Sequence, residues 1–190
     1  MKPAPQALAI GCSAGGLAAL HQVFGGLRGP LPLPVLVVCH TGSEDMAVFC
    51  ELLARTCPMP VAEAIERESP RRGHVHVAPA GYHLLVERDR RFALSIDPRV
   101  EFSRPSIDVL FESAAEAWQQ HLVGVLLTGA NSDGAHGLRH IRRSGGTAVV
   151  EDPATAFASA MPAAALEIAG ADHCVSLPAM PKLLETLCQP

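Results

Sequence analysis

The sequence has few aromatic residues, little charge and no long hydrophobic run. Aromatic residues make up 4% and charged residues 18% of the 190 residues, whereas hydrophobic residues make up 48%. The net charge is −4 and the arginines are scattered or paired, which argues against a nucleic-acid-binding surface. The N-terminus lacks the apolar core of a signal peptide, and runs such as that from Val35 to Cys39 are too short to cross a bilayer. We therefore expect a cytoplasmic protein that binds no nucleic acid and does not insert into a membrane.

The spacings of cysteine and histidine that usually bind metals are also missing. The six cysteines form no C-x-x-C pair, and in a reducing compartment they are predicted to be small buried residues without disulfides. His136 and His140 lie four residues apart on a predicted helix, and His74 and His76 share one side of a predicted strand. Neither pair has a third ligand nearby. We expect neither a metal nor a cofactor.

Short aliphatic runs alternate with amphipathic stretches along most of the chain, a pattern typical of a parallel sheet covered by helices. The length fits one domain over residues 1–190. Residues 83–96 break the alternation, because two apolar runs flank Asp89-Arg90-Arg91, and they predict a hairpin attached to the sheet. We predict an α/β fold: a doubly wound, mostly parallel sheet with helices on both faces and one antiparallel hairpin. Strands are expected at residues 8–10, 34–39, 61–65, 74–78, 123–127, 147–150 and 174–177, and helices at 16–24, 45–55, 106–119 (capped by Ser106), 135–144, 162–169 and 180–188.

The run Gly11-Cys12-Ser13-Ala14-Gly15-Gly16 lies between the first predicted strand and helix and has two interpretations. A dinucleotide-binding loop requires G-x-G-x-x-G, but Ser13 stands at the middle glycine, and the second strand ends in His40 instead of an acid. A P-loop requires a Lys-Ser or Lys-Thr pair that is missing here. The run also matches G-x-S-x-G, the sharp strand-to-helix turn that exposes a nucleophilic serine. Alone this match is weak, because serine in a glycine-rich turn usually only shapes the turn.

A serine hydroxyl is a weak nucleophile until a base takes its proton, and His40 and Asp133 are candidates to assist Ser13. His40 ends the second predicted strand and Asp133 follows the strand at 123–127, so all three residues are expected at the carboxyl edge of the sheet. Each has a simpler interpretation: His40 begins a surface loop, and Asp133 caps the helix that starts near Ala135. Together they match the nucleophile, base and orienting acid of a serine hydrolase. Their chain order differs from that of α/β-hydrolases.

With these motifs the chain resembles the catalytic domain of the chemotaxis protein-glutamate methylesterases, the CheB family. The resemblance implies that Ser13 is the nucleophile, His40 the base and Asp133 its orienting partner, on a doubly wound sheet with a hairpin. It also implies hydrolysis of glutamate methyl esters, and deamidation of certain glutamines, on cytoplasmic helices of chemoreceptors. Methylated receptor helices, or a related methylated protein, are thus the expected partner. The motifs that carry the resemblance occur in the same order at residues 9–16, 40, 76–79, 104–111, 123–129, 132–134 and 161–162.

Three further residues are expected to serve the reaction. The backbone amide of Ala14 and one amide from the loop between Thr128 and Asn131, with Ala130 as the candidate, are expected to bind the oxyanion. Arg104 precedes the Pro-Ser start of a predicted helix. It either contacts the substrate or braces the site, and we favour bracing.

The chain departs from the family pattern after His40, where a proline-bearing loop is usual but residues 41–45 are Thr-Gly-Ser-Glu-Asp. Ala130 stands where a methionine is common. The family's chemotaxis enzymes carry an N-terminal receiver domain, whereas this sequence starts directly at the first strand, so a separate receiver domain is a candidate partner. The alternative function is a non-catalytic signalling module that retains the fold, and a nucleotide-binding switch is disfavoured by Ser13. A serine-directed phosphonate and a nucleotide titration would separate these hypotheses.

Overall fold

The computed structural model describes residues 3–41 and 45–188, which form one parallel sheet and one separate antiparallel pair. In the parallel sheet the seven strands run in the order β3-β4-β2-β1-β7-β8-β9. The antiparallel pair consists of β5 (His83–Val86) and β6 (Phe92–Ser95). The predicted fold class is therefore confirmed. The strands of the large sheet are β1 (Ala7–Cys12), β2 (Val35–Cys39), β3 (Val61–Glu63), β4 (Val75–Val77), β7 (Leu122–Leu126), β8 (Thr147–Glu151) and β9 (His173–Val175).

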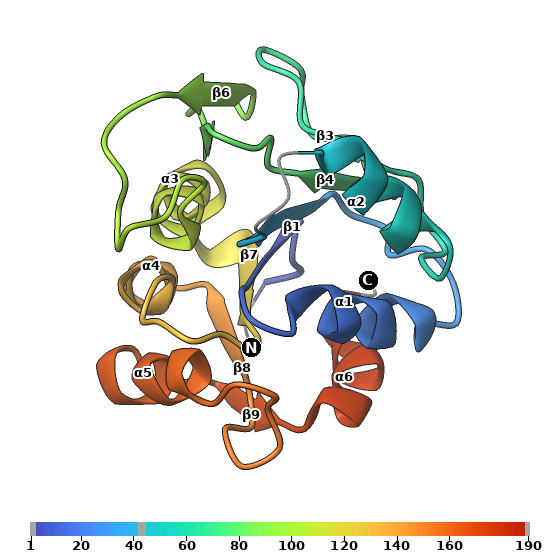
Figure 1. Ribbon diagram of the computed structural model, residues 1–190, viewed down its shortest axis with the longest axis vertical. Helices are drawn as coiled ribbons and strands as arrows, with labels where there is room; N and C mark the ends of the chain where they lie inside the picture. The colour runs from blue at the N-terminus through green and yellow to red at the C-terminus, as the bar shows by residue number, and fades with distance from the viewer. Residues whose placement is uncertain (1–2, 42–44, 189–190) are drawn as a thin grey trace.

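Helices cover both faces of the parallel sheet (Figure 1). One face carries α1 (Gly16–Gly25), α2 (Met46–Ala54) and α6 (Met180–Cys188), and the other carries α3 (Ile107–Trp118), α4 (Ala135–Arg143) and α5 (Ala160–Ile168). Two 3-10 turns, η1 (Gln119–His121) and η2 (Leu177–Ala179), complete the described elements. Among the described residues, none of these helices has the length and apolar character that crossing a membrane requires.

The central strands are buried along their whole length because helices cover them on both sides. Every residue of β1, β2, β7 and β8 is buried, which explains their nearly continuous hydrophobic runs. Alternate side chains enter two separate cores: Leu8 and Ile10 of β1 pack on the α1 side, and Ala7 and Ala9 pack on the α3 side. One sheet thus divides the molecule into two hydrophobic cores.

The predicted hairpin forms, but it does not extend the large sheet. Its strands pair only with each other in the described structure, and β5 packs against α3. Leu84, Val86 and Phe92 are buried in the core on the α3 side. The hairpin therefore buries its apolar face on a helix, which satisfies the same hydrophobic pattern without using an edge of the sheet. Ser106 caps α3 as predicted, although its hydroxyl oxygen lies 3.5 Å from the Val109 amide nitrogen.

The chain reverses its direction of winding at β1. From there it builds β2, β4 and β3 toward one edge of the sheet and β7, β8 and β9 toward the other. Open α/β sheets bind ligands at the carboxyl ends of the strands where the winding reverses. The turns that follow β1, β2 and β7 are therefore the expected location of a functional site.

Close packing of α4 on α3 depends on Gly137. A Cβ atom at this position would lie 2.6 Å from Cβ of Phe111 and 3.0 Å from backbone atoms of Asp108. Backbone atoms in the neighbouring helix cannot move aside as the end of a flexible side chain can. Any side chain at Gly137 must therefore push the two helices apart.

We expect Gly137→Ala to lower the free energy of unfolding by about 1–2 kcal/mol. Overpacking costs about 1–3 kcal/mol, and the better helix propensity of alanine, about 1 kcal/mol, offsets only part of it. Gly29→Ala is the matched control, because a Cβ there meets nothing within 4 Å, and it should change stability by less than about 0.5 kcal/mol. Urea unfolding measures the stability of both variants. If Gly137→Ala were as stable as the unaltered protein, the steric explanation would be contradicted.

Candidate active site

Ser13 lies in the tight turn between β1 and α1. Its amide donates to the carbonyl of Thr128 at 2.9 Å, and its own carbonyl accepts from the amide of Gly16 at 2.7 Å. Gly15 completes the turn with φ +77°, a left-handed conformation that glycine adopts without steric cost. The strand, turn and helix required by the G-x-S-x-G motif are thus present, and they place Ser13 at the carboxyl edge of the sheet.

His40 follows β2 directly and lies beside Ser13. Cys12 and Cys39 are paired in the parallel register, and the amide of His40 donates to the carbonyl of Cys12 at 3.0 Å. Neighbouring strands lie about 5 Å apart, so the next residue on each strand starts at that separation. The register of two buried strands therefore sets the spacing between the serine and the histidine.

Asp133 reaches the same edge from the loop after β7. Its carboxylate is fully buried, and Oδ2 lies 2.9 Å from Nε2 of His40. The distance is that of an ion pair, although the N–H direction of His40 is not aligned with the oxygen. Catalytic hydrogen bonds are often poorly aligned until a substrate binds. The structure thus places His40 in contact with Asp133, with Ser13 after the neighbouring strand at the same sheet edge.

The Asp133 carboxylate is held at the N-terminus of α3. Oδ1 accepts from the hydroxyl of Ser106 at 2.8 Å and from the amide of Asp108 at 3.0 Å, and Oδ2 accepts from the amide of Ile107 at 2.7 Å. These amides have no partner within their own helix, and the helix dipole favours a negative charge beside them. Asp133 therefore satisfies the first turn of α3 with both of its oxygens.

The simpler interpretation of Asp133, a cap for the helix near Ala135, is wrong. That helix, α4, is capped by Gly134 in a left-handed conformation and has no side-chain cap. The carboxylate is directed instead to a helix that comes earlier in the chain.

Hydrogen bonding keeps Asp133 ionised despite its burial. Burial alone would raise the pKa of this carboxyl group. The close contact with His40 and the hydrogen bonds from two backbone amides and the Ser106 hydroxyl outweigh burial, and the pKa lies below its ordinary value. A permanently charged carboxylate is suited to orient an imidazole and to stabilise its protonated form.

Thr128 and Glu151 fix the turn that carries Ser13. The Thr128 hydroxyl donates to the carbonyl of Ala14 at 2.8 Å and accepts from the amide of Ala158 at 2.8 Å. The Thr128 amide in turn donates to the buried carboxylate of Glu151 at 2.8 Å. Sequence reasoning missed Glu151, although an acid directly after the apolar run Ala148-Val149-Val150 was a signal that could have found it.

Two amides of the predicted oxyanion loop already donate to protein acceptors, so fewer are free to bind an oxyanion than expected. The amide of Thr128 is bound to Glu151, and the amide of Gly129 donates to the carbonyl of Ala158 at 3.1 Å. Within the described residues, the amides of Ala14, Ala130 and Asn131 donate to no protein acceptor. Ala14 and Ala130 stay the candidates for binding an oxyanion.

A cavity of about 280 Å³ adjoins His40. Arg104 lines it and donates through Nη1 to the carbonyls of Ile96 and Asp97 at 2.7 and 3.1 Å, so its side chain braces the loop above the site. Ser103 also lines it and places its hydroxyl 3.5 Å from Nδ1 of His40. Sequence reasoning missed Ser103, which no motif marks. Residues 42–44 of the unusual loop after His40 lie outside the described residues.

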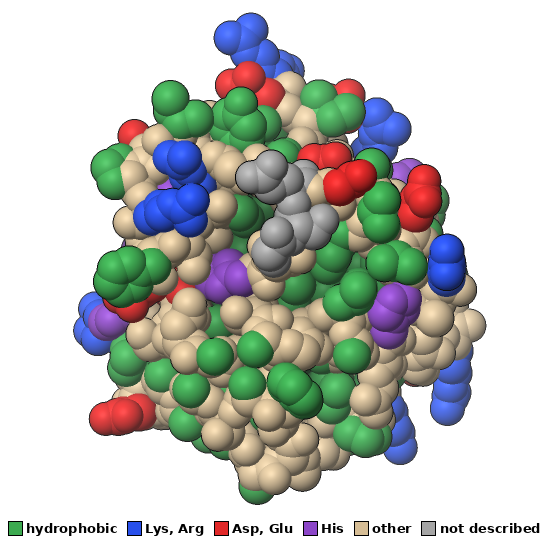
Figure 2. All heavy atoms as spheres, viewed as in Figure 1, with side chains coloured by type: hydrophobic (Ala, Val, Ile, Leu, Met, Phe, Trp, Pro, Cys, Tyr) green, Lys and Arg blue, Asp and Glu red, His purple; other side chains and the backbone are tan. Residues whose placement is uncertain are grey.

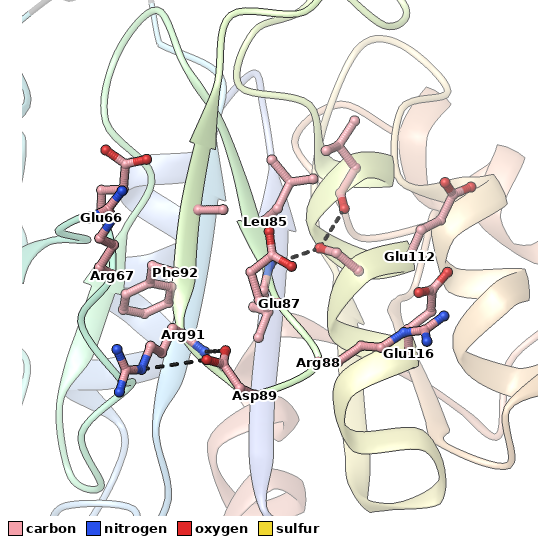
Figure 3. A pocket seen from close by; sticks show the side chains of 14 residues that line it. Glu66, Arg67, Leu85, Glu87, Arg88, Asp89, Arg91, Phe92, Glu112 and Glu116 are labelled. Carbon is pink, nitrogen blue, oxygen red and sulfur yellow. Dashed lines mark hydrogen bonds and ion pairs between the residues drawn. The ribbon is translucent and has the colours of Figure 1, made fainter.

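A groove of about 910 Å³ lies between the hairpin and α3 and contains none of the three proposed catalytic residues. Figure 3 shows Arg88 of the hairpin turn extending toward α3 and Arg91 facing Asp89. The hydroxyl of Ser113 there donates to two carbonyls of its own helix and accepts from the amide of Val86, so it is fully used. Across the described chain, no cluster of three or more His, Cys, Asp or Glu side chains could hold a metal ion.

Residues 8–184 match the family model of the CheB methylesterase. The chain belongs to the CheB methylesterase family. A putative protein-glutamate methylesterase/protein-glutamine glutaminase of Leptospira interrogans is 45% identical over 97% of this chain and 95% of its own length. The protein-glutamate methylesterase/protein-glutamine glutaminase of Symbiobacterium thermophilum is 41% identical over 85% of this chain, which spans 45% of that longer relative.

The fold of the family is also found here. The crystal structure of the Thermotoga maritima CheB methylesterase catalytic domain matches this chain with a TM-score of 0.91 and 28% sequence identity. The match covers 97% of this chain and 100% of the other. The resemblance inferred from the motifs is therefore confirmed at the level of the family and the fold.

Asp108 is a second buried carboxyl group next to the site. It accepts from the amide of Gly137 at 2.6 Å. Burial raises its pKa to about 6, the hydrogen bond from Gly137 opposes this rise, and the charge of Asp133 adds to it. The folded protein therefore binds a proton at Asp108 at pH values where the unfolded chain has released it.

We expect this proton to make stability fall as the pH rises from about 4 to about 6. The folded pKa is raised, so the contribution is complete below the unfolded value and lost above the folded one. Asp108→Asn removes the titration, and its stability relative to the unaltered protein should increase by about 2–3 kcal/mol between pH 4 and pH 7.5. Urea unfolding at both pH values measures the difference. A difference that does not change with pH would contradict the raised pKa.

Proposed function

We propose that this chain hydrolyses methyl esters of glutamate side chains, with Ser13 as nucleophile, His40 as general base and Asp133 as the acid that orients His40. The observation that carries the proposal is the 2.9 Å contact between His40 and Asp133 beside Ser13, at the carboxyl edge where the winding reverses. Membership of the CheB methylesterase family supports it, as do the names of the relatives. The proposed substrate is a methylated chemoreceptor helix or a related methylated protein.

The orientation of the imidazole supports one proposed order of proton transfers. Nε2 of His40 faces Asp133, so Nδ1 is the nitrogen that takes the proton of the Ser13 hydroxyl. The serine oxygen attacks the ester carbonyl, the tetrahedral intermediate collapses, and methanol leaves with the proton from His40. A water molecule then gives its proton to His40 and its oxygen to the acyl group. Ser13 is released and the substrate keeps a glutamate carboxylate.

The amides of Ala14 and Ala130 are proposed to bind the negatively charged oxygen of the intermediate. Neither amide donates a hydrogen bond to a protein acceptor in the described structure. The amide of Ala14 lies just before the N-terminus of α1, where the helix dipole favours negative charge. The same steps convert a glutamine side chain to glutamate, with ammonia leaving in place of methanol. One site thus accounts for both activities named for the relatives.

Methanol release from methylated receptor membranes tests the proposed function directly. Labelling with a serine-directed phosphonate, followed by peptide mapping, tests whether Ser13 is activated. An absence of both reactions would favour the alternative, a non-catalytic signalling module that retains the fold.

We expect Ser13→Ala to reduce ester hydrolysis by about 10³-fold or more, because no other group supplies the attacking oxygen. The fold should stay intact, since the turn is held by backbone hydrogen bonds that alanine keeps. Methanol release and thermal unfolding measure the two effects. Ser144→Ala is the control, because Ser144 follows α4 at the end distant from Asp133. Retention of most activity in Ser13→Ala would exclude serine catalysis here.

We expect Asp133→Asn to retain faint activity, roughly one to two powers of ten above that of Ser13→Ala, because the acid contributes less than the nucleophile. The variant should also lose about 1–3 kcal/mol of stability. Asparagine has one oxygen, so its amide group would face the Ile107 amide where Oδ2 now accepts. Initial rates and urea unfolding separate these effects. Hydrolysis near the normal rate would reduce Asp133 to a cap of α3.

A further inference from the structure

The cavity beside His40 has a charge that the proposed reaction does not use. Its walls include Arg99 and Arg104, and none of the described residues that line it is an acid. Figure 2 shows basic side chains beside a histidine on this face of the molecule. The apolar side chains of Met46 and Phe102 complete the walls. The cavity thus offers positive charge together with apolar surface, next to the proposed base.

Neither arginine is neutralised by a neighbouring acid. Among the described residues, no carboxylate lies within ion-pair distance of Arg99 or Arg104, whereas Arg71, Arg91 and Arg142 are each paired with one. Nη1 of Arg104 is held by two backbone carbonyls, and its Nε is buried without an acceptor. Arg99 is exposed, with Nη1 3.3 Å from the carbonyl of Phe102. Backbone carbonyls position these guanidinium groups but leave their charge unbalanced.

The other large hollow lacks this property. The groove between the hairpin and α3 is lined by five acidic and three basic side chains, and Arg91 there is paired with Asp89. Its charges largely cancel, so it offers no preference for an anion. Of these two hollows, the one next to His40 is therefore the one that places positive charge beside the proposed base.

We propose that this cavity is a subsite for a carboxylate side chain of the substrate, adjacent to the esterified glutamate. The planar guanidinium group matches a carboxylate, and Met46 and Phe102 provide contacts for the methylene groups of a glutamate. On a helical substrate, a residue three or four positions away lies about 5–6 Å from the esterified one and on the same face. This proposal rests on the proposed function, because it names the sequence around the ester that the same site selects.

Two helical peptides that carry a single glutamate methyl ester test the subsite. One has glutamate, and the other glutamine, at the positions three and four residues on either side. We expect the unaltered protein to hydrolyse the glutamate peptide with a kcat/KM about fivefold higher, the effect of one partly exposed charge pair. The preference should shrink as salt concentration rises.

Arg99→Gln should bring the ratio of the two kcat/KM values close to one. Arg99→Lys keeps the positive charge and should restore part of the preference for the glutamate peptide. Arg55→Gln is the matched control, because Arg55 is exposed at the end of α2 distant from Met46, and its ratio should equal that of the unaltered protein. A ratio unaffected by Arg99→Gln, or one near one in the unaltered protein, would overturn the subsite.

Binding to the Ser13→Ala variant keeps the subsite testable apart from the reaction. Fluorescence anisotropy should show tighter binding of the glutamate peptide, and Arg99→Gln in the same background should remove the difference. Equal binding of both peptides would overturn the subsite even where the ester is hydrolysed. If the unaltered protein hydrolyses neither peptide but Ser13→Ala still binds the glutamate peptide more tightly, the result would contradict the proposed function and support the subsite.

Discussion

The buried negative charge of Asp133 is the constraint on which the site depends. An ionised carboxylate costs several kcal/mol to bury unless hydrogen bonds replace its lost water. Here the replacement comes from the start of α3 and from His40, which are distant in the chain. The loop after β7, the first turn of α3 and the histidine after β2 are therefore bound to a single group.

The remaining geometry follows from the packing of the sheet. The register between β1 and β2 sets Ser13 beside His40, and burial of both strands on two faces keeps that register from slipping. The Thr128 hydroxyl then ties the Ser13 turn to the loop after β7. Reactive groups are thus placed by strand pairing and backbone hydrogen bonds, with little reliance on mobile side chains.

The sequence was sufficient to predict what depends on local pattern. Apolar runs indicated the strands, and the ends of those runs placed Ser13, His40 and Asp133 at one edge. It was not sufficient for contacts between distant segments. The helix that receives Asp133 and the surface that covers the hairpin depend on which elements pack together. The cavity beside His40 is similar, because its arginines belong to a loop without a hydrophobic period.

Asp133 holds the start of α3 and is also the proposed partner of His40, and these two roles affect which residues can change during evolution. A copy that no longer needed to hydrolyse esters would be free to replace Ser13 or His40, since neither carries the packing of a helix. It would still be under selection to keep an acid at position 133, because α3 begins on that carboxylate. An aspartate here is therefore a mark of the fold, whereas the proposed nucleophile Ser13 and the proposed base His40 carry no such structural requirement.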